Sequence, residues 1–281
     1  MNNCINLCEI DVENLAKTPT YADQIQDYIK GTHRIYIGSY FCSRFFLSTD
    51  YSTLVEFARI SKCNVTLVLP VFTEKDLQKA KKYIYTILEK YKDVIDEITV
   101  NDLGMLFYVT RNIPIKVNLG RMFYKEPRDV RIPEYYNQDG TLNSLIPLNE
   151  IVDLASLNTI EIDEIKLKIR SESIQTVDIA VHTPFCFMTT GNICKFASIN
   201  KDIDHKFRPN CLCQKECASI YEHYSELYNG FQIDVFRIGR TVYYLNLKRS
   251  KIENLKRNIY FPFLEIIKLM GEDNENTCSF E

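Results

Sequence analysis

The sequence predicts a single α/β domain, a parallel (β/α) barrel of the TIM-barrel type with a cysteine-rich loop segment and a C-terminal hairpin and helix. Three patterns favour this fold. Strand and helix signals alternate between residues 34 and 117, residues 64–71 form a near-continuous apolar run, and residues 73–91 carry one apolar stripe opposite lysines. Continuous apolar strands suit parallel sheets covered by helices, and repeated β–α alternation is typical of such folds.

The N-terminal half supplies the clearest elements. The run RIYIG is a β-branched and aromatic strand that ends at a glycine. Ser48, Thr49 and Asp50 can cap one helix, and Asp102 can open another. In chain order, we expect a helical entry over residues 12–30, strands over 34–38, 64–71, 97–100 and 114–117, and helices over 50–62, 73–91 and 103–111.

The C-terminal half is less regular, because three prolines interrupt residues 118–147. We expect a short helix over 148–157, a strand over 159–162, a helix or extended piece over 163–171, a strand over 177–181, a helix after Cys217 to about Leu227, and a hairpin of 231–238 and 241–247 across Gly239-Arg240. Residues 1–270 are therefore expected to form one domain, and the acidic residues 271–281 a mobile tail.

The composition is that of a globular protein. Hydrophobic residues make up 46% and charged residues 25% of the chain, and no apolar run reaches the roughly 20 residues of a membrane helix. The N-terminus lacks the pattern of a secretory signal, so we expect a cytoplasmic protein with reduced thiols and no membrane span. The formal net charge of -3 argues against nucleic acid as a partner.

Half of the ten cysteines fall within residues 182–217, and they are Cys186, Cys194, Cys211, Cys213 and Cys217. Gly, Pro, Asn and Asp residues surround them and predict mostly irregular loop. Thiolates that converge on zinc or on an iron–sulfur cluster would supply the ordering energy that such a loop lacks. The spacing Cys213-x3-Cys217 differs from the C-x2-C and C-x4-C pairs of structural zinc sites and suits a cluster at least as well.

A barrel would bring a further cysteine to this segment. Loops that follow the C-terminal ends of barrel strands gather on one face, where such folds place their sites. Cys42 follows the strand at 34–38, and the cysteine segment follows the strand at 177–181. The two stretches are therefore expected to meet.

The remaining cysteines have simpler explanations. Cys4, Cys8 and Cys278 lie near the chain ends and are expected to be free thiols, whereas Cys63 is expected in the core. Ordinary buried or free thiols also stay an alternative for each cysteine of the segment.

Four other features have both a functional and a structural explanation. His182 could orient a substrate or hydrogen-bond a cluster sulfur, or it could be a loop histidine. Asp102 could be an active-site carboxylate or a helix cap, and Arg44 could counter cluster charge or be solvated. The basic run at 248–257 could contact an anionic partner or RNA, or it could form a solvated helix face. The sequence contains no phosphate-binding loop, nucleotide glycine fingerprint, zinc-protease helix or G-x-S-x-G turn, and it identifies no catalytic residue.

Two stretches resemble a known family. In residues 178–198, Cys186 and Cys194 flank Gly191, and this run resembles the signature of peptidase family U-thirty-two, the collagenase-like peptidases. The motifs YIGSYFCSRFF and VNDLGM resemble strand-end motifs of the UbiV-like branch of that family, which acts in oxygen-independent ubiquinone hydroxylation. The resemblance covers residues 34–245.

The resemblance implies a ligand set. The UbiV-like branch holds a [4Fe–4S] cluster through one N-terminal cysteine and three later ones, the last two as C-x3-C. The positions implied here are Cys42, Cys194, Cys213 and Cys217. This chain departs from the family at Thr183-Pro184, which replaces a pair of small residues, and by one extra residue after Gly191. Many members use a cysteine at the position of Cys186, so Cys186 is the alternate ligand, and Cys211 ranks lowest.

The function that the resemblance implies is a [4Fe–4S] protein that assists an oxygen-independent hydroxylation or related modification. A second subunit of family U-thirty-two would be its partner, and a small molecule or a peptide its substrate. Two alternatives come from other classes: a metal-dependent U-thirty-two peptidase acting on peptides or collagen-like substrates, and a noncatalytic interaction protein with structural zinc. A fold alone does not choose among them.

Overall fold

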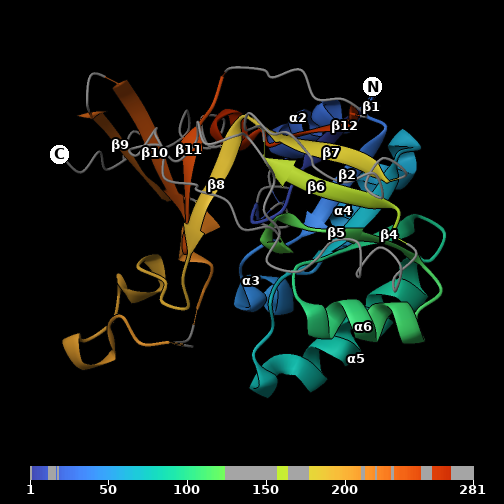
Figure 1. Ribbon diagram of the computed structural model, residues 1–281, viewed down its shortest axis with the longest axis horizontal. Coiled ribbons are helices and arrows are strands. Elements are labelled where there is room, and N and C mark those ends of the chain that lie inside the picture. Colours follow the sequence, from blue (N-terminus) through green and yellow to red (C-terminus); the bar gives the residue numbers. More distant parts are fainter. Residues whose placement is uncertain are drawn as a thin grey trace.

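Figure 1 shows a computed structural model of the chain, in which a parallel barrel adjoins a smaller antiparallel sheet. The structure describes residues 2–11, 17, 19–123, 157–163, 177–209, 213–218, 220–228, 231–247 and 255–266. The predicted parallel α/β barrel is confirmed.

Eight parallel strands of the described residues close the barrel. In order around it they are β1 (Asn2–Asn6), β12 (Leu255–Tyr260), β7 (Asp178–Thr183), β6 (Thr159–Asp163), β5 (Lys116–Leu119), β4 (Ile95–Val100), β3 (Asn64–Leu69) and β2 (Arg34–Gly38). Ile5 of β1 is in register with Ile35 of β2 and with Tyr260 of β12. The first and last of the described strands therefore complete the ring.

Helices cover the outside of the barrel at its N-terminal half (Figure 1). They are α2 (Pro19–Ile29), α3 (Ser43–Ser48), α4 (Ser52–Ser61), α5 (Glu74–Tyr91) and α6 (Leu103–Asn112). The predicted stripe of α5 is confirmed, since Ala80, Ile84 and Ile87 are buried. Asp102 caps α6 by accepting a hydrogen bond from Met105 N–H at 2.8 Å, which is the structural explanation of that residue.

Charged side chains cross the barrel interior. Arg257 of β12 donates two hydrogen bonds to Glu97 of β4, at 2.7 and 2.8 Å, and these strands lie opposite each other in the ring. Burial alone would raise the pKa of Glu97, but the hydrogen bonds from Arg257 and the charge of Arg34 outweigh it and lower that pKa to about 2. The pair thereby ties two distant strands together.

The antiparallel sheet packs at the C-terminal end of the barrel strands. Its order is β8 (Phe185–Thr190), β11 (Thr241–Leu245), β10 (Phe231–Ile238) and β9 (Tyr221–Tyr228). Phe41, after β2, stacks on Phe187 of β8 with ring centroids 4.5 Å apart. Arg121, after β5, pairs with Asp163 of β6 and donates to the carbonyl oxygen of Phe185 at 2.9 Å. Aromatic rings and a buried ion pair thus join the sheet to the barrel.

Two expectations about segments near the chain ends are corrected. Cys8 is outside any disulfide, as a free thiol is, but the described N-terminus is not frayed, because Cys4 and Cys8 lie in and just after β1, where 1% and 0% of their surfaces are exposed. The basic run at 248–257 is predicted as a helix, yet its described part begins β12 and Arg257 is buried. Both errors have the same cause: pairing with distant strands buries segments whose own patterns are weak.

The cysteine segment contains more regular structure than the loop predicted for it, because β8 lies within it. The helix predicted after Cys217 is also wrong, since β9 pairs with β10 along its whole length. The predicted hairpin is confirmed as β10 and β11, which turn at Gly239 with a φ of 60°. Cys63 lies in the core as expected.

Several predicted features lie outside the described residues. They are the first part of the predicted entry helix, at residues 12–16 and 18, the predicted pieces at 148–156 and 164–171, and the predicted mobile tail at 271–281. Most of the basic run, at residues 248–254, and the cysteines Cys211 and Cys278 also lie outside them. The strands predicted at 159–162 and 177–181 are confirmed as β6 and β7. In the part of the chain that the structure describes, no helix is long and apolar enough to span a membrane.

Candidate metal centre

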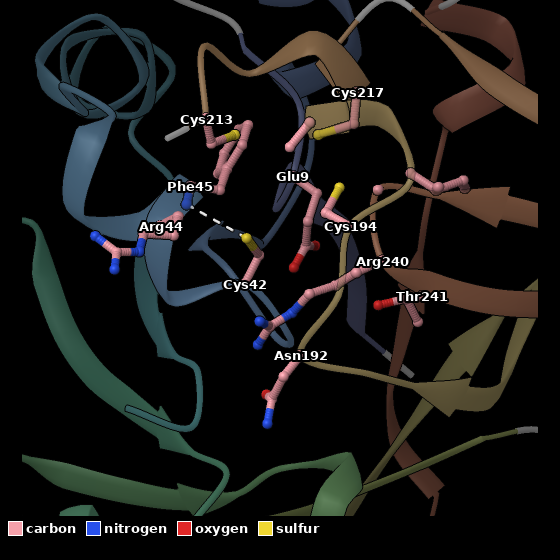
Figure 2. Close-up of a pocket in the computed structure, with 13 residues that line it drawn as sticks. Glu9, Cys42, Arg44, Phe45, Asn192, Cys194, Cys213, Cys217, Arg240 and Thr241 are labelled. Carbon is pink, nitrogen blue, oxygen red and sulfur yellow. Dashed lines mark hydrogen bonds between the residues drawn. The ribbon is translucent and has the colours of Figure 1, made fainter. Parts of the chain in front are cut away.

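Four cysteines from separate parts of the chain line one pocket (Figure 2). Cys42 follows β2, Cys194 follows β8, and Cys213 and Cys217 precede β9. Figure 2 shows their sulfur atoms around the same hollow, which has a volume of about 590 Å³ including open solvent. The predicted meeting of Cys42 with the later cysteine segment is confirmed.

Cys42 is oriented by the loop between β2 and α3. Its N–H donates to Ser39 Oγ at 2.8 Å, and its Sγ accepts a hydrogen bond from Phe45 N–H at 3.4 Å. Cys42 is therefore the N-cap of α3, where a thiol takes the place of the more usual Ser or Asp oxygen. The first turn of α3 holds the sulfur at the pocket wall.

A tight turn presents Cys213 and Cys217. Cys213 Sγ accepts a hydrogen bond from Lys215 N–H at 3.3 Å, and Lys215 has a left-handed backbone with a φ of 64°. Lys215 Nζ lies 3.3 Å from Asp11 Oδ1, beyond the end of β1. Cys217 lies in the short helical turn η5 (Glu216–Ala218). The ion pair thus anchors the cysteine turn to the barrel.

Apolar side chains shield the sulfurs on one side. Phe45 of α3, Phe196 of η3 (Phe196–Ser198) and Cys217 form a small buried cluster, and Cys42 and Cys194 pack against it. Low solvent exposure and N–H donors to sulfur are two means by which proteins tune the potential of an iron–sulfur cluster. Both are present around these cysteines.

The thiols resist ionisation without a counter-charge. Burial raises the pKa of Cys213 to about 12, against the hydrogen bond from Lys215 N–H and with the added repulsion of Cys42. Burial, followed by the charges of Cys42 and Cys194, raises the pKa of Cys217 well above its ordinary value. Burial also raises the pKa of Cys42, against the charge of Arg240. A bound cationic group would offset this repulsion, because metals bind thiolates and release their protons.

The donor set fits a soft metal, because all four converging groups are thiols. Among the residues that the structure describes, however, no three His, Cys, Asp or Glu side chains form a group that could hold one metal ion. Four thiolates around zinc each lie ~2.3 Å from the same ion, which requires a tight convergence. Thiolates around an iron–sulfur cluster bind different iron atoms and can surround a wider hollow.

The other candidates from the sequence, apart from Arg44, lie away from the pocket. Cys186 in β8 is fully buried and does not line the pocket, and burial raises its pKa to about 12. His182 lies in β7 inside the barrel, with Nε2 3.0 Å from Glu161 Oε2, so its prediction as a loop histidine is wrong. Arg44 lines the pocket, but its guanidinium points away from the sulfurs in Figure 2 and lies 3.9 Å from Asp76 Oδ2. Asp102 does not line the pocket.

A second group of titratable residues fills the barrel interior. Glu161 accepts hydrogen bonds from Tyr40 Oη–H at 2.7 Å and from the hydroxyl of Thr99, and it contacts His182. Burial raises the pKa of Glu161 to about 7, against the hydrogen bonds from Thr99 and Tyr40. Burial and the charge of Arg121 lower the pKa of His182, so its imidazole is neutral. The sequence patterns pointed to His182 but not to its partners Glu161, Tyr40 and Thr99.

Sequence reasoning also missed two residues that line the pocket, Glu9 and Arg240. Glu9 follows Cys8 in a stretch that has no strand pattern, and Arg240 belongs to a hairpin turn that had no assigned role. Only the barrel pairing of β1 and the position of the β10–β11 turn bring them to the cysteines.

Comparisons of the chain with protein-family models, curated proteins and solved structures found no match. The fold and the site therefore define its class: an α/β barrel whose strand ends support a pocket lined by four cysteines.

Proposed function

We propose that the chain is a [4Fe–4S] protein that assists an oxygen-independent hydroxylation or related modification, in the manner of the UbiV-like branch of peptidase family U-thirty-two. One observation carries the proposal: Cys42, Cys194, Cys213 and Cys217 line the same pocket. These are the four positions that the motif resemblance implies as ligands, and they come from segments far apart in the chain.

In this proposal, the residues around the pocket donate hydrogen bonds to the ligand sulfurs, shield them from water and offset their charge. The N–H groups of Phe45 and Lys215 donate to two of the ligand sulfurs, and the ring of Phe196 limits water access. Arg240 lines the wall and offsets part of the negative charge of the thiolates, since its charge opposes the burial that raises the pKa of Cys42. A bound [4Fe–4S] cluster would supply one-electron transfer or activate a substrate at iron.

Three further parts of the proposal rest on the resemblance and on the number of reduced thiols. The location is a reducing cytoplasm, because free cysteines and clusters persist there. The partner is a second subunit of family U-thirty-two. The substrate is a small molecule or a peptide.

Anaerobic purification with iron and sulfide tests the cofactor. We expect a brown protein that holds iron and sulfide in the ratio of a [4Fe–4S] cluster, measured by chemical analysis and electron paramagnetic resonance. A colourless protein loaded with zinc contradicts the proposal. Casein or collagen hydrolysis that one point substitution abolishes would favour the peptidase alternative instead.

Substituting Cys42 and Cys186 separately tests the ligand set. Cys42→Ser should remove most of the bound iron, because this sulfur faces the pocket. Cys186→Ala should retain it, because Cys186 is buried in β8 away from the pocket. Circular dichroism of both proteins controls for folding. Loss of iron from Cys186→Ala, with retention in Cys42→Ser, would assign the fourth ligand to Cys186.

A further inference from the structure

Glu9 reaches the cysteine pocket from the barrel side. It follows β1, lines the pocket together with the four cysteines and has only 8% of its surface exposed. Its backbone φ is 61°, in the left-handed region that residues other than glycine rarely adopt. Such conformations persist where the surrounding structure enforces them, and they concentrate at functional sites.

One carboxylate oxygen of Glu9 holds the loop that carries Cys42. Oε1 accepts hydrogen bonds from Ser39 Oγ–H at 2.7 Å, Tyr40 N–H at 2.7 Å and Phe41 N–H at 3.2 Å. Ser39 Oγ in turn accepts a hydrogen bond from Cys42 N–H at 2.8 Å. A continuous set of hydrogen bonds therefore links Glu9 to the backbone of a candidate ligand.

Arg240 holds the same loop from the antiparallel sheet. Its Nε donates to the carbonyl oxygen of Phe41 at 2.7 Å, and a second nitrogen of the guanidinium donates to the same oxygen. The backbone of Phe41 is thus bound at its N–H by Glu9 and at its carbonyl by Arg240. The loop is fixed between the barrel and the sheet.

The other carboxylate oxygen of Glu9 does not bind the loop that carries Cys42. Oε2 is buried and has no hydrogen-bond partner. A buried carboxylate oxygen without a donor is unfavourable, so its position needs a reason. Figure 2 shows the Glu9 carboxylate between Cys42 and Arg240, facing the hollow that the sulfurs surround. Among the described residues that line the pocket, Glu9 is the one acid.

We propose that Glu9 is a functional residue of the metal centre: it positions Cys42 through Oε1, and its carboxylate places a negative charge against the bound group and lowers the reduction potential of that group. The inference rests on the proposed function. A nearby negative charge disfavours the addition of an electron, and local charge and hydrogen bonding set the potentials of iron–sulfur clusters. No motif of the sequence assigns this role to Glu9.

The variant E9Q separates the charge of Glu9 from its shape. The amide oxygen still accepts the loop's hydrogen bonds, so we expect iron content close to that of the wild type. The charge is lost, so we expect a higher midpoint potential in an anaerobic titration followed by electron paramagnetic resonance. E89Q on the exposed face of α5 is the matched control and should leave both values unchanged. A midpoint potential equal to that of the wild type in E9Q overturns the charge role.

The variant E9A tests the positioning role, because it removes the acceptor itself. We expect iron to be released to a chelator roughly tenfold faster, the factor that loss of one hydrogen bond to a charged group corresponds to. In cluster-free protein, alkylation of Cys42 should accelerate to a similar extent, as followed by mass spectrometry. Wild-type rates in a folded E9A protein overturn the role. If E9A does not fold, E9D replaces it, because the shorter side chain cannot reach all three donors.

If the proposed function is wrong, the wild type itself fails to bind a cluster, and this outcome differs from a failed role of Glu9 in a protein that does bind one. A wild-type protein that takes up no iron and sulfide removes the proposed function and the charge role with it. The alkylation rate of Cys42 in cluster-free protein still decides whether Glu9 holds the loop, because that measurement needs no bound group.

Discussion

Glu97 and Glu161 are both buried in the barrel, yet their pKa values shift in opposite directions. Burial by itself would raise the pKa of either carboxylate, and the other contributions decide the net shift. Around Glu97, hydrogen bonds from Arg257 and the charge of Arg34 outweigh burial and lower the pKa to about 2. Around Glu161 the direct donors are neutral hydroxyls, including that of Tyr40, so burial dominates and the pKa rises to about 7. The nature of the partner decides which protonation state the fold favours.

Glu161→Gln should flatten the pH dependence of stability between about pH 5 and pH 7. The pKa of Glu161 rises from 4.5 to about 7 on folding, so the folded state binds this proton more tightly than the unfolded state. Its stabilising contribution is present below pH 4.5 and is lost as the pH rises toward about 7. At ~1.4 kcal/mol per pKa unit, the loss is on the order of 3 kcal/mol.

Urea unfolding of both proteins at several pH values measures this effect. The Gln side chain has the shape of the carboxyl group and no proton to lose in this range, so its stability should vary less with pH. Equal pH dependence in the two proteins would show that Glu161 does not control it.

Strands β1 and β12 decide whether the barrel closes. β1 pairs with β2 and β12, and β12 also pairs with β7. Neither strand is strongly apolar, since their sequences are NNCIN and LKRNIY. Closure leaves no open sheet edge, so the backbone hydrogen bonds of both strands are satisfied despite their weak patterns. The ion pair of Arg257 with Glu97 then fixes β12 across the interior.

Arg257→Ala should lower the free energy of unfolding by ~3–5 kcal/mol, because it leaves the buried carboxylate of Glu97 without its principal partner. The double variant Arg257→Ala/Glu97→Gln should recover part of this loss, since it removes the uncompensated charge. Chemical denaturation measures the wild type, Arg257→Ala, Glu97→Gln and the double variant. Arg59→Ala on the exposed face of α4 is the control and should have a much smaller effect. Additive losses in the double variant would show that the pair does not interact.

The cysteine pocket joins parts of the molecule that strand pairing leaves separate. Cys42 belongs to the barrel, whereas Cys194 and Cys217 belong to segments that flank the antiparallel sheet. Lys215 with Asp11 and Arg240 with Phe41 add polar contacts between the same two parts. A group bound to all four sulfurs would therefore couple the sheet to the barrel.

Loading the pocket with iron and sulfide should raise the melting temperature. A group that binds only the folded protein stabilises it by about 2.7 kcal/mol at a hundredfold excess over its Kd. Anaerobic calorimetry of loaded and cluster-free protein measures the difference. Cys217→Ala removes one of the sulfurs that face the pocket, so its melting temperature should not respond to loading. An equal rise in Cys217→Ala would place the stabilising group elsewhere.

The predictions that hold rest on local patterns. The apolar run at 64–71 and the stripe at 73–91 became β3 and α5, because burial on a sheet or on one helix face selects these periodicities directly. Of the two explanations that the sequence left open for Asp102, the structure bears out the helix cap, since capping depends on residues three positions apart. The helix predicted after Cys217 failed because pairing with β10 outweighs the local preference of the segment.

The order of residues along the chain was enough to indicate a parallel barrel and the meeting of Cys42 with the later cysteines, since alternating strands and helices force the strand ends onto one face. The burial of β1 and β12, the separation of Cys186 from the pocket and the entry of Glu9 into it follow from tertiary structure alone. Each of these depends on contacts between segments far apart in the chain. Periodicity reports which face of a segment is buried, but it does not report which distant segment buries it.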